Sequence, residues 1–220
     1  MLTTVLTIIE YIGVVSFAIS GALMAIDKEN DFIGVIFLAL ITTFGGGMIR
    51  DIFIGHNPPV FFTLYPLVIT CIVTATVTFV LAAIFKRKYV ENENLINSVN
   101  NYIDALGLGV FVISGAKLCI DLGIDNPFLI VIMGMISGTG GSMTRDIIMN
   151  EVPALLRRRV YLVAAICGAA LYYALYSFGV SDIISMPVSI ILIVLIRILA
   201  TVFKLNFPKA IDFSKMSENK

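Results

Sequence analysis

The chain has 220 residues, of which 59% are hydrophobic and 14% charged, and its 15 basic and 15 acidic residues give a formal net charge of zero. This composition excludes a soluble globular domain. The basic residues form no nucleic-acid-binding pattern. The three cysteines all fall in apolar stretches, so they predict neither a disulfide framework nor a metal site.

Seven apolar stretches are long enough to cross a bilayer core, which requires about 20 helical residues. In chain order they cover residues 5–26, 32–54, 65–85, 102–120, 127–149, 160–178 and 183–203. The sequence therefore predicts an all-α integral membrane protein with seven transmembrane helices. We expect no enzyme, because His56 is the only histidine and no strand precedes the Gly-rich segments as a phosphate loop requires.

Two parts of the chain repeat each other. GGGMIRDI at residues 45–52 returns as GGSMTRDI at 140–147, and FAISGA at 17–22 returns as FVISGA at 111–116. Each copy holds three apolar stretches, an odd number, so the second copy enters the membrane from the opposite side. Inverted repeats of this kind build symmetric transport pathways near the bilayer midplane. The repeat predicts a protein that transports something across a membrane.

We expect a single membrane domain, because neither three-helix half can satisfy its polar groups in lipid alone. The predicted divisions are a membrane domain over 1–205, with repeat one at 8–86, a polar linker at 87–100, repeat two at 101–178 and an unpaired seventh helix at 183–203, and a cytoplasmic tail over 206–220. With the N-terminus outside, nearly all Lys and Arg fall at inner loops and helix ends, and the outer ends hold only Arg50. This bias predicts an outer N-terminus and a cytoplasmic C-terminus.

The Gly-rich motifs lie within the second and fifth spans. Consecutive glycines destabilise a helix by about 1 kcal/mol each relative to alanine. At membrane depth they predict either a bent or broken helix beside a polar cavity or a very close helix crossing. The two motifs should lie close together near the two-fold axis. The candidate helix-break residues are Gly45, Gly46, Gly47, Gly140, Gly141 and Ser142.

An Arg-Asp pair follows each glycine motif. Adjacent residues on a helix do not face one another, so we expect Arg50 to pair with Asp146, and Arg145 with Asp51. The alternative is that both arginines snorkel to the nearer interface. Small hydroxyl side chains recur in the same region. Each alone is more often a helix-packing residue, but their recurrence in both repeats makes them candidates for lining an ion pathway. They are Ser20, Ser114, Thr42, Thr43, Ser137 and Thr139.

Two further basic residues lie inside spans. Lys117 corresponds to Leu23 in repeat one, so the symmetry does not require a charge there. It either snorkels to the outer interface or responds to voltage, which acts on a full unit charge with about 2.3 kcal/mol per 100 mV. Arg197 lies near the inner end of the seventh span, where we expect it to snorkel.

The twin motifs GGGMIRDIFIGHNPP and GTGGSMTRDIIMNEVP resemble those of the prokaryotic trimeric intracellular cation (TRIC) channel family, whose repeat is also called a glycine transporter domain. The resemblance covers about residues 5–205. It implies a homotrimer in the prokaryotic plasma membrane, with a pore for monovalent cations, chiefly potassium, between the repeats of each protomer. It also implies that the second and fifth helices are kinked at the glycines.

The resemblance bears on two further positions. Lys117 looks similar to the basic fourth-helix residue that is discussed in this family as a voltage-responsive element. Animal members bind a phosphoinositide through a Lys-containing motif after the first glycines. Arg50-Asp51 occupies that region here, so phosphoinositide regulation is not carried over.

We therefore expect a passive channel for monovalent cations. One alternative is a secondary transporter of a small zwitterion such as glycine, whose carboxylate and ammonium groups the Arg-Asp pairs could bind. Another is a structural or lipid-binding membrane protein. No cofactor is expected, and the expected partners are permeant potassium or sodium ions and membrane lipids.

Overall fold

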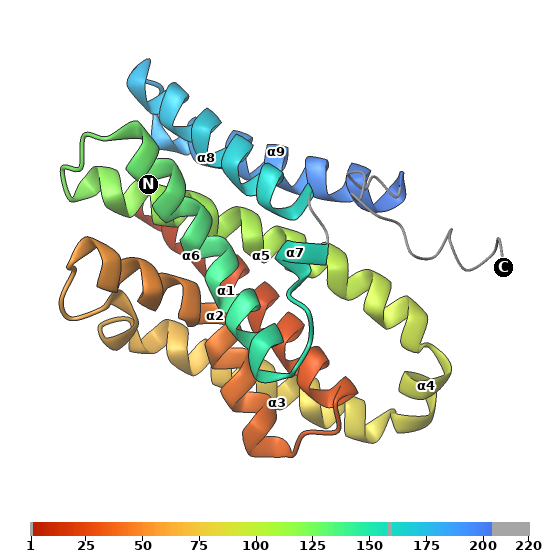
Figure 1. The fold of residues 1–220 in the computed structure, drawn as a ribbon. Helices are drawn as coiled ribbons and strands as arrows, with labels where there is room; N and C mark the ends of the chain where they lie inside the picture. Colours follow the sequence, from red (N-terminus) through yellow and green to blue (C-terminus); the bar gives the residue numbers. More distant parts are fainter. Residues whose placement is uncertain (1, 158–159, 204–220) are drawn as a thin grey trace, which may run out of the picture.

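The computed structural model describes residues 2–157 and 160–203, and the tail expected over 206–220 lies outside the described residues. Every regular element in the described residues is a helix (Figure 1). In chain order they are α1 (Leu2–Asp27), α2 (Phe32–Ile54), η1 (Val60–Phe62), α3 (Tyr65–Ile84), α4 (Lys86–Glu91), α5 (Glu93–Asp121), α6 (Pro127–Ile148), α7 (Ala154–Arg157), α8 (Val160–Ser177) and α9 (Asp182–Val202).

Seven of these helices, α1, α2, α3, α5, α6, α8 and α9, are long and apolar enough to cross a membrane. Their bounds lie within a few residues of the predicted spans, with one exception. Helix α5 begins at Glu93, whereas the sequence predicts a span from residue 102, and α4 fills much of the expected linker. Polarity places a segment outside the hydrocarbon core but does not prevent it from being helical, so the linker is mostly helix rather than loop.

The helices form two inverted three-helix repeats and a seventh helix. Helices α1, α2 and α3 make repeat one, and α5, α6 and α8 make repeat two. Helices α1, α2, α5 and α6 pack together at the centre, α3 lies against α1 and α2, and α8 lies against α5 and α6. Helix α9 packs on α5 and α8. We call the end of the molecule at which α4 lies the α4 end, and the opposite end the η1 end.

Caps at matching positions set the register of the two central helices. The Asp31 side chain accepts a hydrogen bond from the backbone of Gly34 at the start of α2, and Asn126 caps the start of α6 in the same way. Past the ends of these helices, Gly55 and Asn150 both have positive φ, at 71° and 55°. Because side-chain caps satisfy otherwise unpaired backbone groups, both copies begin at equivalent residues and bring their glycines to the same depth.

The glycine motifs do not interrupt the helices. Both α2 and α6 are helical through their glycines, so the expectation of broken helices is wrong and the alternative of a close crossing describes this structure. A Cβ built on Gly46 would lie 2.2 Å from the carbonyl oxygen of Ser137, and one on Gly141 would lie 2.1 Å from that of Thr42. Only glycine fits at these two positions, because the backbones of α2 and α6 are in direct contact there.

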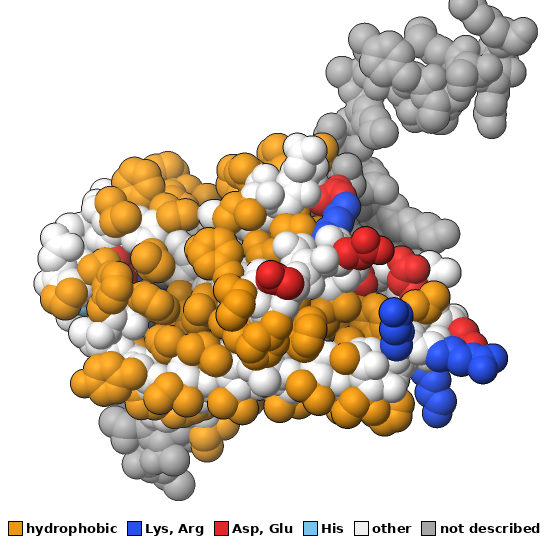
Figure 2. All heavy atoms as spheres, turned by 90° about the horizontal axis from the view of Figure 1, so that it is seen from below, with side chains coloured by type: hydrophobic (Ala, Val, Ile, Leu, Met, Phe, Trp, Pro, Cys, Tyr) orange, Lys and Arg blue, Asp and Glu red, His pale blue; other side chains and the backbone are white. Residues whose placement is uncertain are grey.

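The surface is apolar over much of its area. Figure 2 shows one face covered largely by hydrophobic side chains, with Lys and Arg gathered toward one end. Helix α3 contributes Ile69, Val73, Val77, Leu81 and Ile84, which are all at least half exposed. A soluble protein rarely exposes so large a continuous apolar surface, whereas a lipid-facing helix requires it.

Candidate functional site

Arg50 and Asp51 form a buried ion pair on α2, directly beyond the glycines. The Nε and Nη2 atoms of Arg50 donate to Oδ1 of Asp51 at 2.9 and 2.7 Å, and Nη1 donates to the Ser137 hydroxyl of α6 at 3.0 Å. The second oxygen of Asp51 accepts the backbone N–H of Val60 at 2.8 Å. The pair thus holds α2 to both α6 and the η1 connection.

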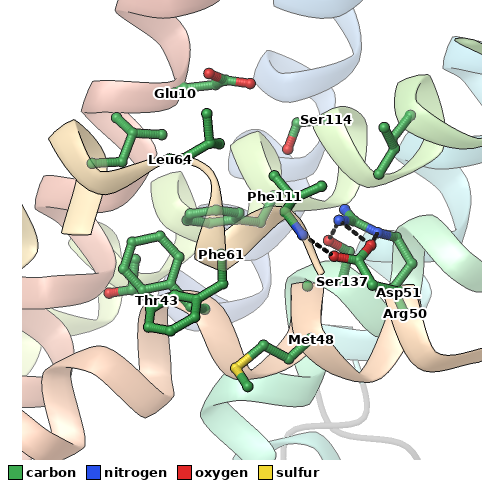
Figure 3. A pocket seen from close by; sticks show the side chains of 15 residues that line it. Glu10, Thr43, Met48, Arg50, Asp51, Phe61, Leu64, Phe111, Ser114 and Ser137 are labelled. Atoms are coloured by element: carbon green, nitrogen blue, oxygen red, sulfur yellow. Dashed lines mark hydrogen bonds and ion pairs between the residues drawn. The ribbon is translucent and has the colours of Figure 1, made fainter. Parts of the chain in front are cut away.

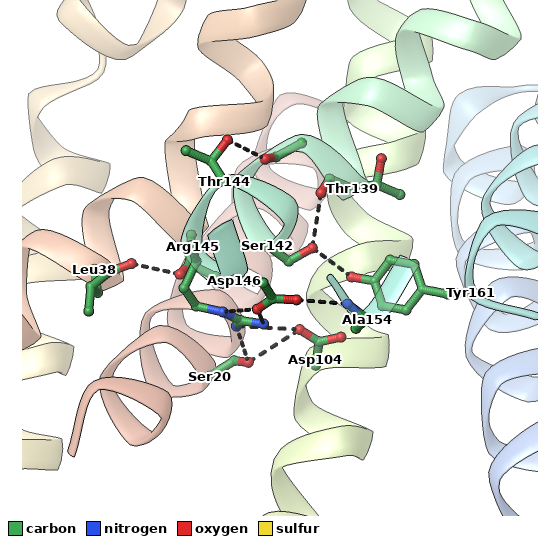
Figure 4. Close-up of polar contacts among 12 residues, drawn as sticks. Ser20, Leu38, Asp104, Thr139, Ser142, Thr144, Arg145, Asp146, Ala154 and Tyr161 are labelled. Carbon is green, nitrogen blue, oxygen red and sulfur yellow. Dashed lines mark hydrogen bonds and ion pairs between the residues drawn. The ribbon is translucent and has the colours of Figure 1, made fainter. Parts of the chain in front are cut away.

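Arg145 and Asp146 repeat this arrangement on α6 (Figure 4). Nε and Nη2 of Arg145 donate to Oδ1 of Asp146 at 2.9 and 2.8 Å, and Nη1 donates to the Ser20 hydroxyl of α1 at 3.1 Å. Oδ2 of Asp146 accepts the backbone N–H of Ala154 at 2.8 Å. In both copies one carboxylate oxygen holds the arginine and the other holds the chain that follows the helix.

The predicted cross-pairing is therefore wrong, because each arginine pairs with its own neighbour in the chain. Adjacent Cβ atoms do point apart, but the arginine side chain is long enough to fold back and present two N–H groups to the neighbouring carboxylate. The snorkelling alternative is also wrong. Arg50 and Arg145 are each only 6% exposed. Each arginine contacts the other repeat through a serine hydroxyl rather than through an opposite charge.

Each ion pair lines a cavity that opens toward its own end of the molecule. The Arg50 cavity, toward the η1 end, has a volume of about 110 Å³ (Figure 3). The Arg145 cavity, toward the α4 end, has a volume of about 320 Å³. The Arg50 cavity is lined by polar groups from Glu10, Thr43, Arg50, Asp51, Ser114 and Ser137, and the Arg145 cavity by polar groups from Ser20, Asn97, Asp104, Arg145, Asp146 and Glu151. The tight crossing of α2 and α6 separates the two cavities.

A matched pair of acidic residues in these cavities, Glu10 and Asp104, was not predicted from the sequence. They occupy equivalent positions in the repeats, seven residues before the phenylalanines that begin FAISGA and FVISGA. Each is followed three residues later by a glycine, Gly13 and Gly107, at which the first helices of the two repeats approach one another. Extending the comparison of the two motifs about two helical turns toward the N-terminus would have found them.

Arg197 of α9 belongs to the same site, although the sequence predicted a different role for it. It is 4% exposed and its Nη2 donates to Oδ2 of Asp104 at 3.3 Å, so the expectation that it snorkels is wrong. Its guanidinium lies 4.2 Å from the centre of the Tyr161 ring, and the hydroxyl of Tyr161 is 3.1 Å from that of Ser142. The seventh helix therefore does more than pack on α5 and α8. It also supplies the positive charge that pairs with Asp104 beside the Arg145 cavity.

The candidate hydroxyl groups divide into two sets. Thr43, Ser114 and Ser137 line the Arg50 cavity and Ser20 lines the Arg145 cavity. Three others bond mainly to their own helix and line neither cavity. Thr42 donates to the carbonyl of Leu38 at 2.6 Å, Thr139 to that of Met135 at 2.8 Å, and Ser142 to that of Thr139 at 3.0 Å.

Lys117 is paired rather than free. Its Nζ lies 2.9 Å from Oδ1 of Asp121 on the same helix and 3.0 Å from Oδ2 of Asp182 on α9, and Tyr172 donates to Asp182 at 2.9 Å. The side chain of Lys117 is 18% exposed. Lys117 thus joins α5 to α9 near the η1 end, and its response to voltage stays a prediction.

No group of three or more His, Cys, Asp or Glu in the described part of the chain is arranged to hold a metal ion. The site instead consists of two cavities, related by the inverted repeat, each with a buried Arg-Asp pair, a serine from the other repeat and an acidic residue. Fold and site together define a membrane transport protein. Equivalent parts of the two repeats line the two cavities.

Comparisons with known proteins give the particular family. The model of the Glycine transporter family matches residues 7–83 and 101–177, one match in each repeat. The UPF0126 inner membrane protein YadS of Escherichia coli K12 is 34% identical over 91% of this chain and 93% of its own length. A UPF0126 membrane protein of Deinococcus radiodurans is 38% identical over 76% of this chain and 74% of its own.

Solved structures agree with this assignment. A TRIC cation channel described for its conductance is 36% identical, with a TM-score of 0.81, over 94% of this chain and 97% of its own. The TRIC channel orthologue from Rhodobacter sphaeroides is 32% identical, with a TM-score of 0.80, over 92% of this chain and all of its own. The chain belongs to the prokaryotic TRIC channel family. These solved neighbours are channels rather than enzymes, and they support a cation channel.

Proposed function

We propose that the protein is a passive channel for monovalent cations, chiefly potassium, with one pore in each protomer between the two repeats. The observation that carries this proposal is the pair of matched cavities, which approach each other from opposite ends and are separated by the α2–α6 crossing. Both cavities are lined by carboxylates and hydroxyls, the groups that replace the hydration shell of a cation.

The arginines do not oppose cation passage. An unpaired guanidinium in a pore repels cations, but each arginine is held at two points by the adjacent carboxylate. Conduction in this scheme requires the α2–α6 crossing to open. The backbone contacts at Gly46 and Gly141 are the part of the pathway that must separate.

The same proposal covers assembly and orientation. We propose a homotrimer in the prokaryotic inner membrane, with the η1 end outside and the α4 end in the cytoplasm. The basic residues near α4, including Lys86, Arg87 and Lys88, support this orientation by the positive-inside rule. The TRIC neighbours, one of them described as a trimeric intracellular cation channel orthologue, support the trimer.

A transporter of a small zwitterion is the second candidate, and the name of the matching family model favours it. The geometry of the arginines opposes it. Arg50 and Arg145 already use Nε and both terminal nitrogens on protein oxygens. Binding a substrate carboxylate there would require breaking a buried ion pair, which is costly.

Purified protein in planar bilayers and liposomes tests the proposal. A channel gives discrete unitary currents whose reversal potential follows the potassium gradient. Glycine counterflow that saturates with substrate, without unitary currents, would instead establish the transporter. A structural or lipid-binding role gives no flux of either kind, and it would overturn the proposal.

A further inference from the structure

The two cavities carry equivalent acidic residues that differ in their partners. Asp104 accepts hydrogen bonds from Ser20 at 3.2 Å and from Arg197 at 3.3 Å, and Arg145 approaches it at 4.0 Å. Glu10, its counterpart in repeat one, receives no hydrogen bond or ion pair from the described residues, although it lines the Arg50 cavity. In Figure 3 it lies apart from the ion pair, with Ser114 between them in this view.

The charged side chains that line the two cavities therefore sum to different net charges. In the Arg50 cavity the ion pair cancels, and among the described lining residues the carboxylate of Glu10 is the charge that remains. In the Arg145 cavity the ion pair also cancels, Arg197 compensates Asp104, and Lys28 pairs with Glu151. The Arg50 cavity carries a net negative charge and the Arg145 cavity does not.

We propose that the Arg50 cavity contains a monovalent-cation binding site in which Glu10 is the charged ligand. We also propose that Arg197, which the unpaired seventh helix supplies, removes the equivalent site from the Arg145 cavity. This inference rests on the proposed channel function and names where its permeant ion binds. The cavity of about 110 Å³ has room for a cation that keeps some of its water.

The chemistry of the site favours a monovalent ion. Divalent cations in proteins are held by several oxygen ligands, commonly with more than one carboxylate. Here the second carboxylate, Asp51, has one oxygen on Arg50 and the other on a backbone N–H. One free carboxylate in a cavity that is also lined by hydroxyl groups concentrates a monovalent cation without binding it so tightly that it cannot leave. The attraction must weaken as salt screens it.

The first test uses unitary currents of the full-length trimer in planar bilayers. Glu10→Gln should reduce potassium current entering from the η1 end by about threefold or more at low KCl, because local cation concentration falls, and the reduction should shrink at high KCl. Glu10→Asp should retain most of the current. The matched control is Asp125→Asn, which removes an exposed charge from the α5–α6 loop at the same end without touching the cavity.

The second test measures binding without conduction. At constant ionic strength, replacing N-methylglucamine chloride with KCl should raise the unfolding temperature of the wild-type trimer and of Asp125→Asn, but not that of Glu10→Gln. If Glu10→Gln matches Asp125→Asn in both measurements, the proposed site is overturned. If the wild type conducts nothing but still shows potassium-dependent stabilisation, the channel proposal fails while the binding site stands.

The role of Arg197 has its own test. Arg197→Met leaves Asp104 uncompensated, so potassium current entering from the α4 end at low KCl should rise. Adding Asp104→Asn should return it to the wild-type value. Equal currents in the single and double variants would overturn the role given to Arg197. The Glu10 variants decide the rest of the proposal even where Arg197→Met fails to assemble.

Discussion

The Arg50 and Arg145 cavities share one design and differ in what surrounds it. In both, an arginine is held by the next aspartate, and that aspartate holds the following chain by one backbone N–H. Behind the Arg145 pair lie Tyr161, Ser142 and Arg197 of α9. In repeat one Gly47 replaces Ser142, and none of the described helices corresponds to α9 there.

This difference shows how a fold built from two equivalent repeats can have cavities of different net charge at its two ends. The inverted repeat places the same ion pair in both cavities. The seventh helix then packs mainly on repeat two and places its buried charge, Arg197, beside the Arg145 cavity. Asymmetry of charge between the two cavities follows from that single addition.

The largest effects are expected at the α2–α6 crossing, where the two halves are equivalent. An added Cβ at Gly46 or Gly141 lies little more than 2 Å from a backbone oxygen, at 2.2 and 2.1 Å. Because backbone cannot move aside cheaply, Gly46→Ala and Gly141→Ala should each lower the stability of the trimer by about 1–3 kcal/mol or more. Leucine at either position should abolish flux. Thermal unfolding in detergent and liposome flux measure both.

Gly47→Ala is the matched control for the crossing. The nearest atom to its added Cβ is a terminal nitrogen of Arg50 at 3.7 Å, an ordinary contact. Its expected effect is neutral or stabilising by up to about 1 kcal/mol, since alanine favours helix. If Gly46→Ala and Gly47→Ala unfold at the same temperature, the crossing is looser than the structure shows.

Replacing the aspartate of each Arg-Asp pair should lower the free energy of unfolding by different amounts in the two cavities. Among the described residues, Asp51→Asn leaves the buried Arg50 without a carboxylate at ion-pairing distance and should cost about 3–5 kcal/mol. Asp146→Asn should cost less, because Asp104 lies 4.0 Å from Arg145 and compensates part of its charge. Chemical or thermal unfolding of both variants gives the comparison. Equal losses would show that Asp104 does not compensate Arg145.

Lys117 gives a smaller effect, on gating rather than stability. Its partners Asp121 and Asp182 are partly exposed, so Lys117→Gln should cost no more than about 1 kcal/mol. We expect it to flatten the voltage dependence of opening while leaving unitary conductance nearly unchanged. Single-channel recordings over a range of voltages test this. A fall in conductance with an unchanged voltage response would place Lys117 in the pathway instead.

The smallest expected change concerns the network that only the second half has. Tyr161→Phe removes one hydrogen bond to Ser142 and keeps the ring beneath Arg197, so it should cost about 1 kcal/mol. Currents from the two ends should keep their wild-type ratio, because no charge changes. A shift of that ratio would mean that the tyrosine hydroxyl itself influences the Arg145 cavity.

The sequence by itself determined the seven helices, their inverted repetition and the depth of the charged motifs. These follow from one constraint, because a chain in lipid must satisfy its backbone hydrogen bonds internally and cover them with apolar side chains. Hydropathy therefore reports the spans directly. The error at the start of α5 has the same origin, since hydropathy detects the bilayer and not the helix that continues beyond it.

Only the tertiary structure decided which groups meet. Cross-pairing of the arginines was a reasonable inference from helix geometry, but the conformation of a long side chain depends on the oxygens around it, and those come from Ser137 and Ser20 of the opposite repeats. Likewise the sequence offered a bend or a close crossing at the glycines, and the choice depended on a second helix lying against them.

The pairing of Arg197 with Asp104 illustrates the limit most clearly. The two residues come from the seventh helix and the fourth span, and they meet because α9 packs on α5. The sequence repeat does not predict where α9 packs, because α9 lies outside both copies. Glu10 and Asp104 themselves were readable as a repeated position in the sequence. That one of them is compensated and the other is not depends on where the unrepeated helix packs, which only the folded chain determines.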